Sequence, residues 1–145
     1  MSTDLPSGFF EHLVDDSPDA VIYADAGGLI RYWNAAATRV FGIGEGEAID
    51  ARLDLIIPER LRSRHWEGYD KIMHGAKSRY GSGALLTVPV LHKDGRQISI
   101  EFTILPLRSG AGTLLGIAAF LRDTTARFEE VRALRRELAA SKQGR

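Results

Sequence analysis

The sequence contains no cysteine, which excludes a disulfide framework, a thiolate metal site and a cysteine nucleophile. It has no excess of charge of either sign, because 19 lysines and arginines face 19 aspartates and glutamates, so a bulk attraction to nucleic acid is not expected. Its apolar runs, such as 114–121, are far shorter than the roughly 20 residues that cross a bilayer. Residues 1–10 carry no secretion signal pattern. We therefore expect a soluble, cytoplasmic protein with no membrane contact and no nucleic-acid partner.

Motifs that mark common enzyme active sites are also missing from the sequence. There is no Gly-x-Ser-x-Gly, no phosphate-binding loop and no His-Glu-x-x-His. The glycines within 42–46 precede no Lys-Ser or Lys-Thr pair, so this stretch is expected to be a loop. His12, His74 and His92 are scattered and lack the spacing of a zinc site. We expect no enzymatic activity from this chain.

The length of 145 residues and a hydrophobic content of 44% fit a single globular domain. The expected strands are 20–25, 29–33, 84–92, 97–108 and 113–122, and the expected helices are 35–41, 58–74 and 125–141. Gly27-Gly28 turns the first hairpin, and Asn34 is expected to cap the helix that follows. In 97–108, isoleucine and phenylalanine alternate with polar residues, which indicates a half-buried antiparallel strand. The pattern predicts an α+β domain with one antiparallel sheet.

Several short stretches follow one another in an order and spacing that resemble the PAS sensory domain. They are Ser17-Pro-Asp-Ala-Val-Ile-Tyr-Ala-Asp25, Gly28-Leu-Ile-Arg-Tyr-Trp-Asn34, Val40-Phe-Gly42, Ile57-Pro-Glu59, Lys93-Asp-Gly95, Gly116 and Arg122-Asp-Thr-Thr125. The resemblance covers about 13–127 and implies a five-stranded antiparallel sheet with short helices over one face, a small-molecule pocket between them, and flanking N- and C-terminal helices. It implies an N-terminal helical cap over 1–18, a PAS sensor core over 19–122 and a C-terminal signalling and dimerisation helix over 123–145.

His65 lies on the apolar stripe of the expected helix 58–74, where leucine or isoleucine would be usual. The stripe consists of Leu61, His65, Tyr69, Ile72 and Met73. A buried polar group without a partner costs about 1–3 kcal/mol, and a neutral imidazole is a good iron ligand. Two interpretations stay open: His65 binds a ligand in the core, or it sits on a rim and contacts Asp54 or solvent.

Ile57-Pro-Glu59 followed by His65 is similar to the haem-binding PAS domains of bacterial oxygen-sensing histidine kinases, in which the haem-ligating histidine follows the glutamate by six residues. The resemblance implies b-type haem with His65 as the axial metal ligand. It places Lys71 and Arg79 near the haem propionates, and Leu85, Leu86, Phe102 and Ile104 on the distal wall; Tyr69 offers a further hydroxyl donor to a ligand. The gas-sensing arginine of that family falls at Leu85 or Leu86, so CO or NO would suit this site better than O₂. A different small ligand, or a core filled by its own side chains, are the alternatives.

The expected C-terminal helix is too short to be stable alone and needs a partner surface. We expect a homodimer interface formed by the apolar stripe of this helix together with apolar N-terminal residues. These residues are Phe128, Val131, Leu134 and Leu138, with Phe9, Phe10 and Leu13. Residues 1–50 carry a net charge of −7 and residues 124–145 a net charge of +3, which indicates either docking between the two ends or merely two solvated surfaces. Two functions remain: a ligand sensor that acts on a downstream signalling domain or partner protein, or a cofactor-free PAS dimerisation module.

Overall fold

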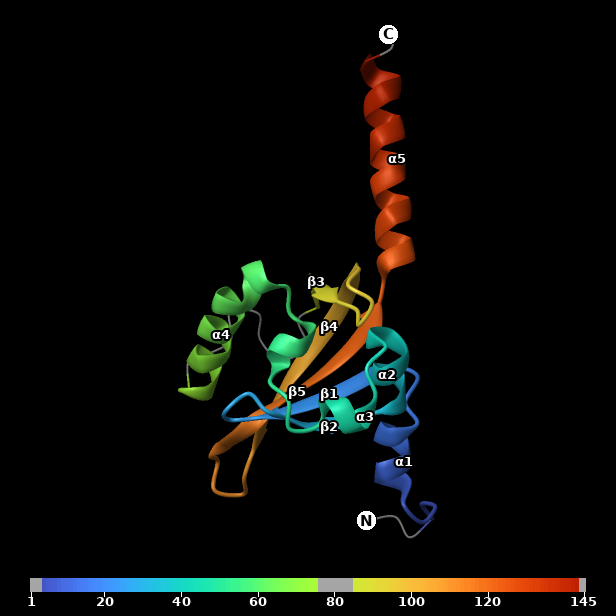
Figure 1. Ribbon diagram of the computed structural model, residues 1–145. Coiled ribbons are helices and arrows are strands. Elements are labelled where there is room, and N and C mark those ends of the chain that lie inside the picture. The colour runs from blue at the N-terminus through green and yellow to red at the C-terminus, as the bar shows by residue number, and fades with distance from the viewer. Residues whose placement is uncertain (1–3, 76–84, 144–145) are drawn as a thin grey trace.

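The computed structural model describes residues 4–75 and 85–143, and it contains a five-stranded antiparallel sheet. The strand order is β2-β1-β5-β4-β3, so the N-terminal hairpin pairs with the last strand of the chain (Figure 1). The strands are β1 (Ala20–Asp25), β2 (Ile30–Trp33), β3 (Leu86–Leu91), β4 (Gln97–Arg108) and β5 (Leu114–Asp123). The predicted α+β architecture and all five strands are confirmed, each with bounds within two residues of the expected ones.

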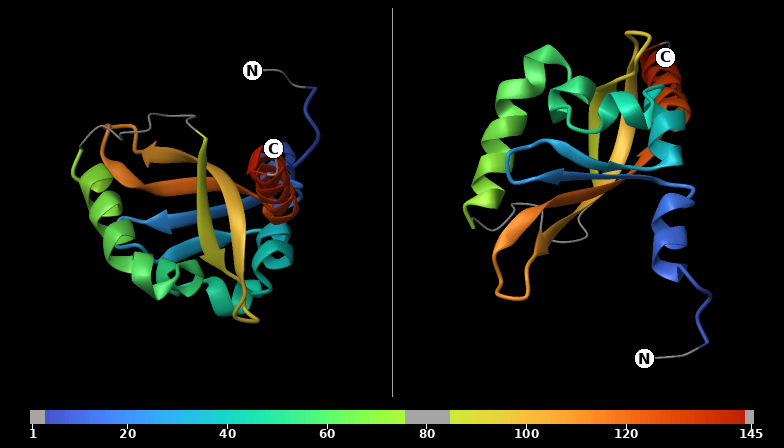
Figure 2. Two further views of the ribbon diagram at one scale, coloured as in Figure 1. Left: turned by 90° about the horizontal axis from the view of Figure 1, so that it is seen from above. Right: turned by 60° about the horizontal axis from the view of Figure 1, so that its bottom comes forward.

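Six helices accompany the sheet in the described residues. They are α1 (Phe9–Asp15), α2 (Ala35–Phe41), α3 (Glu45–Ala48), the 3₁₀ helix η1 (Leu53–Ile56), α4 (Glu59–Met73) and α5 (Thr125–Gln143). The helices α2 to α4 wrap over one face of the sheet (Figure 2). By contrast, α1 and α5 extend from opposite ends of the core (Figure 1). None of the helices within 4–75 and 85–143 is long and apolar enough to cross a membrane.

The core lies between the sheet and the helices α2 to α4. Strand β4 contributes Ile98 and Ile100, which are buried, and strand β5 contributes Ile117 and Leu121. Phe41 at the end of α2 is fully buried against these strands and packs on Trp33, with ring centroids 5.4 Å apart. The alternation predicted for 97–108 is therefore correct, because the isoleucines face the helices.

Asn34 joins three elements and is the one polar residue that is buried among those described, at 4% exposure. Its Oδ1 accepts hydrogen bonds from the backbone N–H of Val21 and of Ala37, so it caps α2 as predicted. Its Nδ2 donates to the carbonyl oxygens of Val14 and Asp19. The amide thus ties the end of α1 to the start of β1 and of α2.

The expectation of a plain loop at 42–46 is wrong, because α3 begins at Glu45. The four-residue helix has Ala48 fully buried, so packing against the core rather than a periodic pattern stabilises it. Gly42 has φ +72°, a left-handed conformation that suits glycine and ends α2. Gly42 and Gly44 therefore separate the two helices, whereas Gly46 lies inside α3.

Candidate functional site

Two aromatic side chains fasten helix α4, Tyr69 to the N-terminal hairpin and Trp66 to η1. The hydroxyl of Tyr69, which is buried, donates to the backbone carbonyls of Asp25 and Ala24 at 2.5 and 3.1 Å. The Nε1–H of Trp66 donates to Asp54 at 2.6 Å. These contacts fix how α4 lies against the core.

The hairpin turn is shaped to receive Trp66. A Cβ atom at Gly28 would lie 2.2 Å from the Trp66 ring, and the φ of Gly28 is +83°, so glycine is required there on both counts. The Arg52 guanidinium lies over the same ring, 4.5 Å from its centroid. Trp66 therefore contacts both a backbone turn and a cation.

His65 lies beside these anchors on α4 and is half-buried. Its ring packs edge-on against Trp66, with centroids 4.8 Å apart, and lies 5.8 Å from the ring of Tyr69. Its Nδ1 atom is buried and has no hydrogen-bond partner among the described residues. Leaving a buried nitrogen unpaired is unfavourable by about 1–3 kcal/mol, so a ligand that pairs with this atom would gain from it.

The surroundings of His65 favour its neutral form. Burial lowers the pKa of the imidazole below its ordinary value of 6.5, and the negative charge of Asp54 opposes this only in part. The expected alternative of a hydrogen bond from His65 to Asp54 is not what the structure shows, because that carboxylate accepts from Trp66 and pairs with Arg52. A neutral imidazole with a free buried nitrogen can accept a hydrogen bond or coordinate a metal ion.

The other residues expected at a haem site are dispersed. Lys71 is exposed and pairs with Glu67 one helical turn earlier, at 3.3 Å. Leu85 is 63% exposed, whereas Leu86 is half-buried at the start of β3. Arg79 lies outside the described residues. In the structure, therefore, neither Lys71 nor Leu85 is gathered around His65.

Two predicted wall residues and Tyr69 do belong to the core. Phe102 and Ile104 are partly buried and pack against the same cluster of apolar side chains as Tyr69. Tyr69 directs its hydroxyl to backbone carbonyls, so offering it to a ligand would require that bond to be broken. Within 4–75 and 85–143, no group of three or more acidic or histidine side chains could hold a metal ion.

The hydrogen bond between Trp66 and Asp54 was not predicted from the sequence. The two residues are 12 positions apart and lie on different elements, so no local pattern connects them. The sequence did indicate that Trp66 faces the core side of α4, because it lies three residues before Tyr69 and seven before Met73, at the edge of the apolar stripe.

The start of α5 is hydrogen-bonded to strand β4. The N–H of Ser99 donates to Thr125 Oγ1 at 2.9 Å, and the N–H of Thr124 donates to the Ser99 carbonyl at 2.9 Å. Asp123 accepts from the N–H and the hydroxyl of Thr125. Since Ser99 lies between the core residues Ile98 and Ile100, a change in core packing at β4 would reach the first turn of α5 directly.

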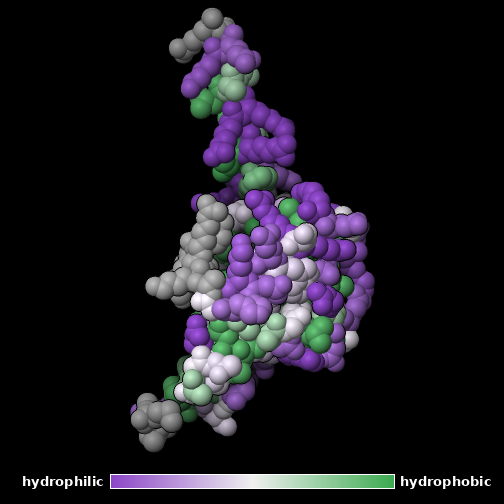
Figure 3. Space-filling view, turned by 90° about the vertical axis from the view of Figure 1, so that its left-hand side faces the viewer, coloured by the Kyte–Doolittle hydropathy of each residue, from purple (hydrophilic) through white to green (hydrophobic). Residues whose placement is uncertain are grey.

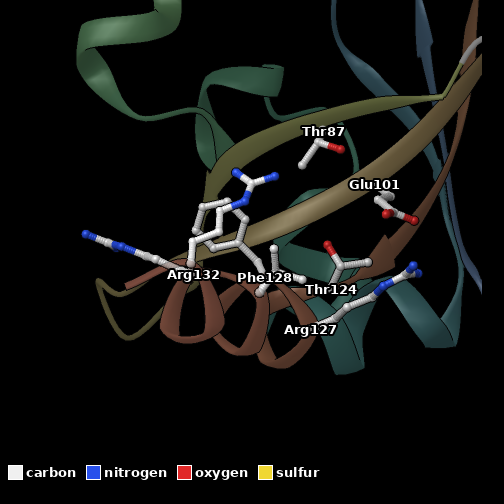
Figure 4. A pocket seen from close by; sticks show the side chains of 8 residues that line it. Thr87, Glu101, Thr124, Arg127, Phe128 and Arg132 are labelled. Atoms are coloured by element: carbon white, nitrogen blue, oxygen red, sulfur yellow. The ribbon is translucent and has the colours of Figure 1, made fainter. Parts of the chain in front are cut away.

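A groove of about 550 Å³ lies where α5 leaves the sheet (Figure 4). Thr87 and Glu101 form one wall, on the strand face opposite the core, and α5 contributes Phe128 and several arginines to the other. The arginines are Arg127, Arg132 and Arg135. The groove is therefore separate from His65 and belongs to the root of α5.

The residues expected at a dimer interface are largely exposed in the single chain. Phe10 and Leu13 of α1 are exposed, whereas Phe9 is half-buried. On α5, Phe128, Val131, Leu134 and Leu138 are all exposed, and no residue of this helix is buried. Both flanking helices thus present apolar side chains that the described chain leaves at least partly exposed.

Comparison with known proteins gives one family for nearly the whole chain. The PAS fold family matches residues 8–124. The chain is 34% identical over 125 residues to an uncharacterized protein of Azorhizobium caulinodans, covering 86% of this chain and 17% of that one. It is 32% identical over 108 residues to the sensor protein FixL of Bradyrhizobium diazoefficiens, covering 74% of this chain and 21% of FixL.

A solved structure of similar fold is that of an RNA-binding light-oxygen-voltage receptor, with a TM-score of 0.73 and 20% identity over 99% of this chain and 41% of the receptor. At this identity the likeness concerns the fold alone. The chain spans about a fifth of the length of the curated relatives it matches, so those proteins contain more than this domain. Together with the five-stranded sheet and its helical cover, the match over residues 8–124 establishes that the chain belongs to the PAS family.

Proposed function

We propose that this PAS domain is a ligand-sensing module of a signal-transduction protein, and that it binds its ligand through His65. PAS domains serve as sensor domains in such proteins, and FixL, a relative over 74% of this chain, is itself a sensor protein. The observation that carries the proposal is the buried Nδ1 of His65, which lacks a partner in the described chain. A ligand that hydrogen-bonds to or coordinates this nitrogen makes a favourable interaction that the free protein does not have.

The first candidate ligand is b-type haem. The donor fits: His65 is neutral because burial lowers its pKa, and Phe102 and Ile104 supply apolar surface in the same core. Bound haem iron would supply a coordination position for a diatomic gas. Lys71 would have to leave Glu67 to reach a propionate, so the protein would have to rearrange on that side of α4.

The binding state would be passed on through β4 to α5. A ligand shifts such an equilibrium only if it binds one arrangement more tightly than the other. Here the route is short, because the backbone of Ser99 is hydrogen-bonded to Thr124 and Thr125 at the root of α5. The role of the domain in this proposal is to bind and relay, with no catalysis of its own.

We also propose that the chain acts as a homodimer, with the exposed apolar residues of α1 and α5 at the interface. Burying them would remove several large apolar side chains from water at about 25 cal/mol per Å² of covered apolar surface. A downstream domain or partner protein would then respond to the geometry of the paired helices.

The test is a titration of the purified chain with haemin, followed by visible absorption. The proposal predicts a Soret band at a stoichiometry of one haem per chain that is lost in His65→Ala. His74→Ala is the matched control, since His74 is an exposed histidine at the end of the same helix, bonded to the Asp70 carbonyl. If haem is not taken up, or His65→Ala binds it as well as the wild type, the haem assignment is wrong; should no other small ligand bind either, the cofactor-free dimerisation module is the better description.

A further inference from the structure

The groove between α5 and the strands β3 and β4 has a lining suited to a second ligand. Its volume of about 550 Å³ falls within the roughly 300–1,000 Å³ that is typical of small-molecule sites. Glu101, which lines it, lies between Ile100 and Phe102 on β4, and those two side chains pack in the core, so the groove is on the other face of the sheet. A molecule in the groove would therefore not compete with a ligand at His65.

The charges of α5 are divided between two sides of the helix. At about 100° per residue, three arginines fall within an arc of about 140°, and the three glutamates of α5 fall within the remaining part of the circumference. The arginines are Arg127, Arg132 and Arg135, and the glutamates are Glu129, Glu130 and Glu137. The arginines line the groove, and the glutamates do not. Because the helix projects beyond the core with hydrophilic and hydrophobic residues both accessible, its exposed cationic side can be reached by a ligand (Figures 1 and 3).

The positive charge of the groove is not balanced within residues 4–75 and 85–143. The ion pairs in that part of the chain involve none of the three groove arginines. Glu101 is the one carboxylate in the described lining, so cations outnumber it three to one. Arg132 and Arg135 are three residues apart and are neighbours on the helix surface, where like charges repel. An anion in the groove would therefore relieve a repulsion and pair with several guanidinium groups at once.

The groove also offers an aromatic surface and hydrogen-bonding groups. Phe128 is 49% exposed and lies between Arg127 and Arg132 along the groove (Figure 4). Guanidinium groups bind phosphate oxygens in pairs, an exposed phenyl ring can stack on a flat ring, and the carboxylate of Glu101 can accept a hydrogen bond from a hydroxyl or amino group. Because Arg127 and Arg135 are eight residues apart, or about 12 Å along the helix, a single phosphate ion cannot span the cations. The lining therefore fits a larger molecule that carries phosphate groups and an aromatic ring together.

We propose that this groove binds a small phosphorylated molecule with an aromatic ring, of the nucleotide class, between the arginines of α5 and the strands β3 and β4. Thr124 connects the site to the relay, because its side chain lines the groove and its N–H donates to the Ser99 carbonyl at 2.9 Å. A molecule that contacts both α5 and the strands favours the arrangement in which it reaches both. The domain then has two inputs, one in the core at His65 and one at the root of α5.

Isothermal titration calorimetry of the full chain tests the charges of the groove, with ATP and inorganic tripolyphosphate as the two probes. The proposal predicts that each chain binds one ATP, and that Arg127→Gln with Arg132→Gln weakens the binding of both probes about tenfold or more, because charge-assisted hydrogen bonds to phosphate are lost. Arg136→Gln is the matched control, since Arg136 lies on the same helix but outside the lining, and it should bind both probes as the wild type does. If ATP does not bind, or if the double variant binds it as tightly as the wild type, the proposal is wrong.

Phe128→Leu tests the aromatic part of the site. The variant keeps an apolar side chain, so ATP should bind about threefold to tenfold more weakly, while tripolyphosphate binds as it does to the wild type. Equal affinities of the wild type and Phe128→Leu for ATP would overturn the assignment of an aromatic ligand. Because Phe128 also belongs to the proposed dimer interface, sedimentation velocity compares the oligomeric state of this variant with that of the wild type; the arginine variants change no residue of that interface. His65→Ala should bind ATP as the wild type does, so a failure of haem binding leaves this site intact, and loss of ATP binding in His65→Ala would contradict a separate groove.

Discussion

Replacing Asn34 by alanine removes four hydrogen bonds from a side chain that is 4% exposed. Two backbone N–H groups, of Val21 and Ala37, lose an acceptor at 3.0 Å, and the carbonyls of Val14 and Asp19 lose a donor. Loss of a helix cap alone is worth about 1 kcal/mol, and buried backbone groups left without partners add more, so we expect destabilisation of about 2–4 kcal/mol.

Asn34→Asp separates the contribution of the two hydrogen bonds that Asn34 accepts from that of the two it donates. The carboxylate still accepts from both N–H groups, but it cannot donate, and it places a negative charge beside two carbonyl oxygens. We therefore expect Asn34→Asp to be less stable than the wild type as well. Urea unfolding followed by circular dichroism measures both variants, with unchanged m-values as the check on two-state behaviour. An Asn34→Ala variant within about 0.5 kcal/mol of the wild type would refute the argument that this amide joins α1, β1 and α2.

Three further variants test the packing and the titration of the site. Gly116→Ala should destabilise the sheet by about 2 kcal/mol or more in urea unfolding, because its Cβ would lie 2.2 Å from the Ala24 carbonyl oxygen; unchanged stability would contradict that close approach. Gly68→Ala, where a Cβ on α4 meets nothing within 4 Å, should instead stabilise the chain by about 0.5–1 kcal/mol, and a loss would show that this face of α4 is occupied. Since burial lowers the pKa of His65 below 6.5, the unfolded chain takes up the proton first, and stability should fall as the pH drops below 6.5. His65→Phe should reduce that fall, and an identical pH profile would contradict the burial of the ring.

The elements with a strong period were predictable from the sequence. The alternation in β4 extends over many residues, so the burial of Ile98 and Ile100 follows from spacing alone. The stripe of α4 includes Tyr69, but its hydroxyl also suited the surface, and its burial became clear only in the structure. The short helices α3 and η1 were not predicted, because four residues carry no period and are stabilised by neighbouring elements.

The candidate site was predictable only in its centre. The stripe of α4 identifies His65 as a polar residue on an apolar face, and in the structure its Nδ1 is buried without a partner among the described residues; that it binds a ligand stays a prediction. The spacing of residues did not predict which partners the long side chains contact. Lys71 pairs with Glu67 on its own helix, and Trp66 pairs with Asp54 on another element. Such choices depend on which partner the fold brings within reach.

The central claim is that His65 is a neutral, half-buried imidazole whose buried Nδ1 is free to bind a ligand. Nitrogen-15 NMR of the histidine side chains, recorded from pH 5 to 8 with and without a diamagnetic metalloporphyrin, tests it most directly. The account predicts that His65 titrates below its ordinary pKa of 6.5 and that its nitrogen resonances shift on addition of the porphyrin, whereas those of His74 do not. A His65 ring that titrates at 6.5 or above and whose resonances are unchanged by the porphyrin would contradict it.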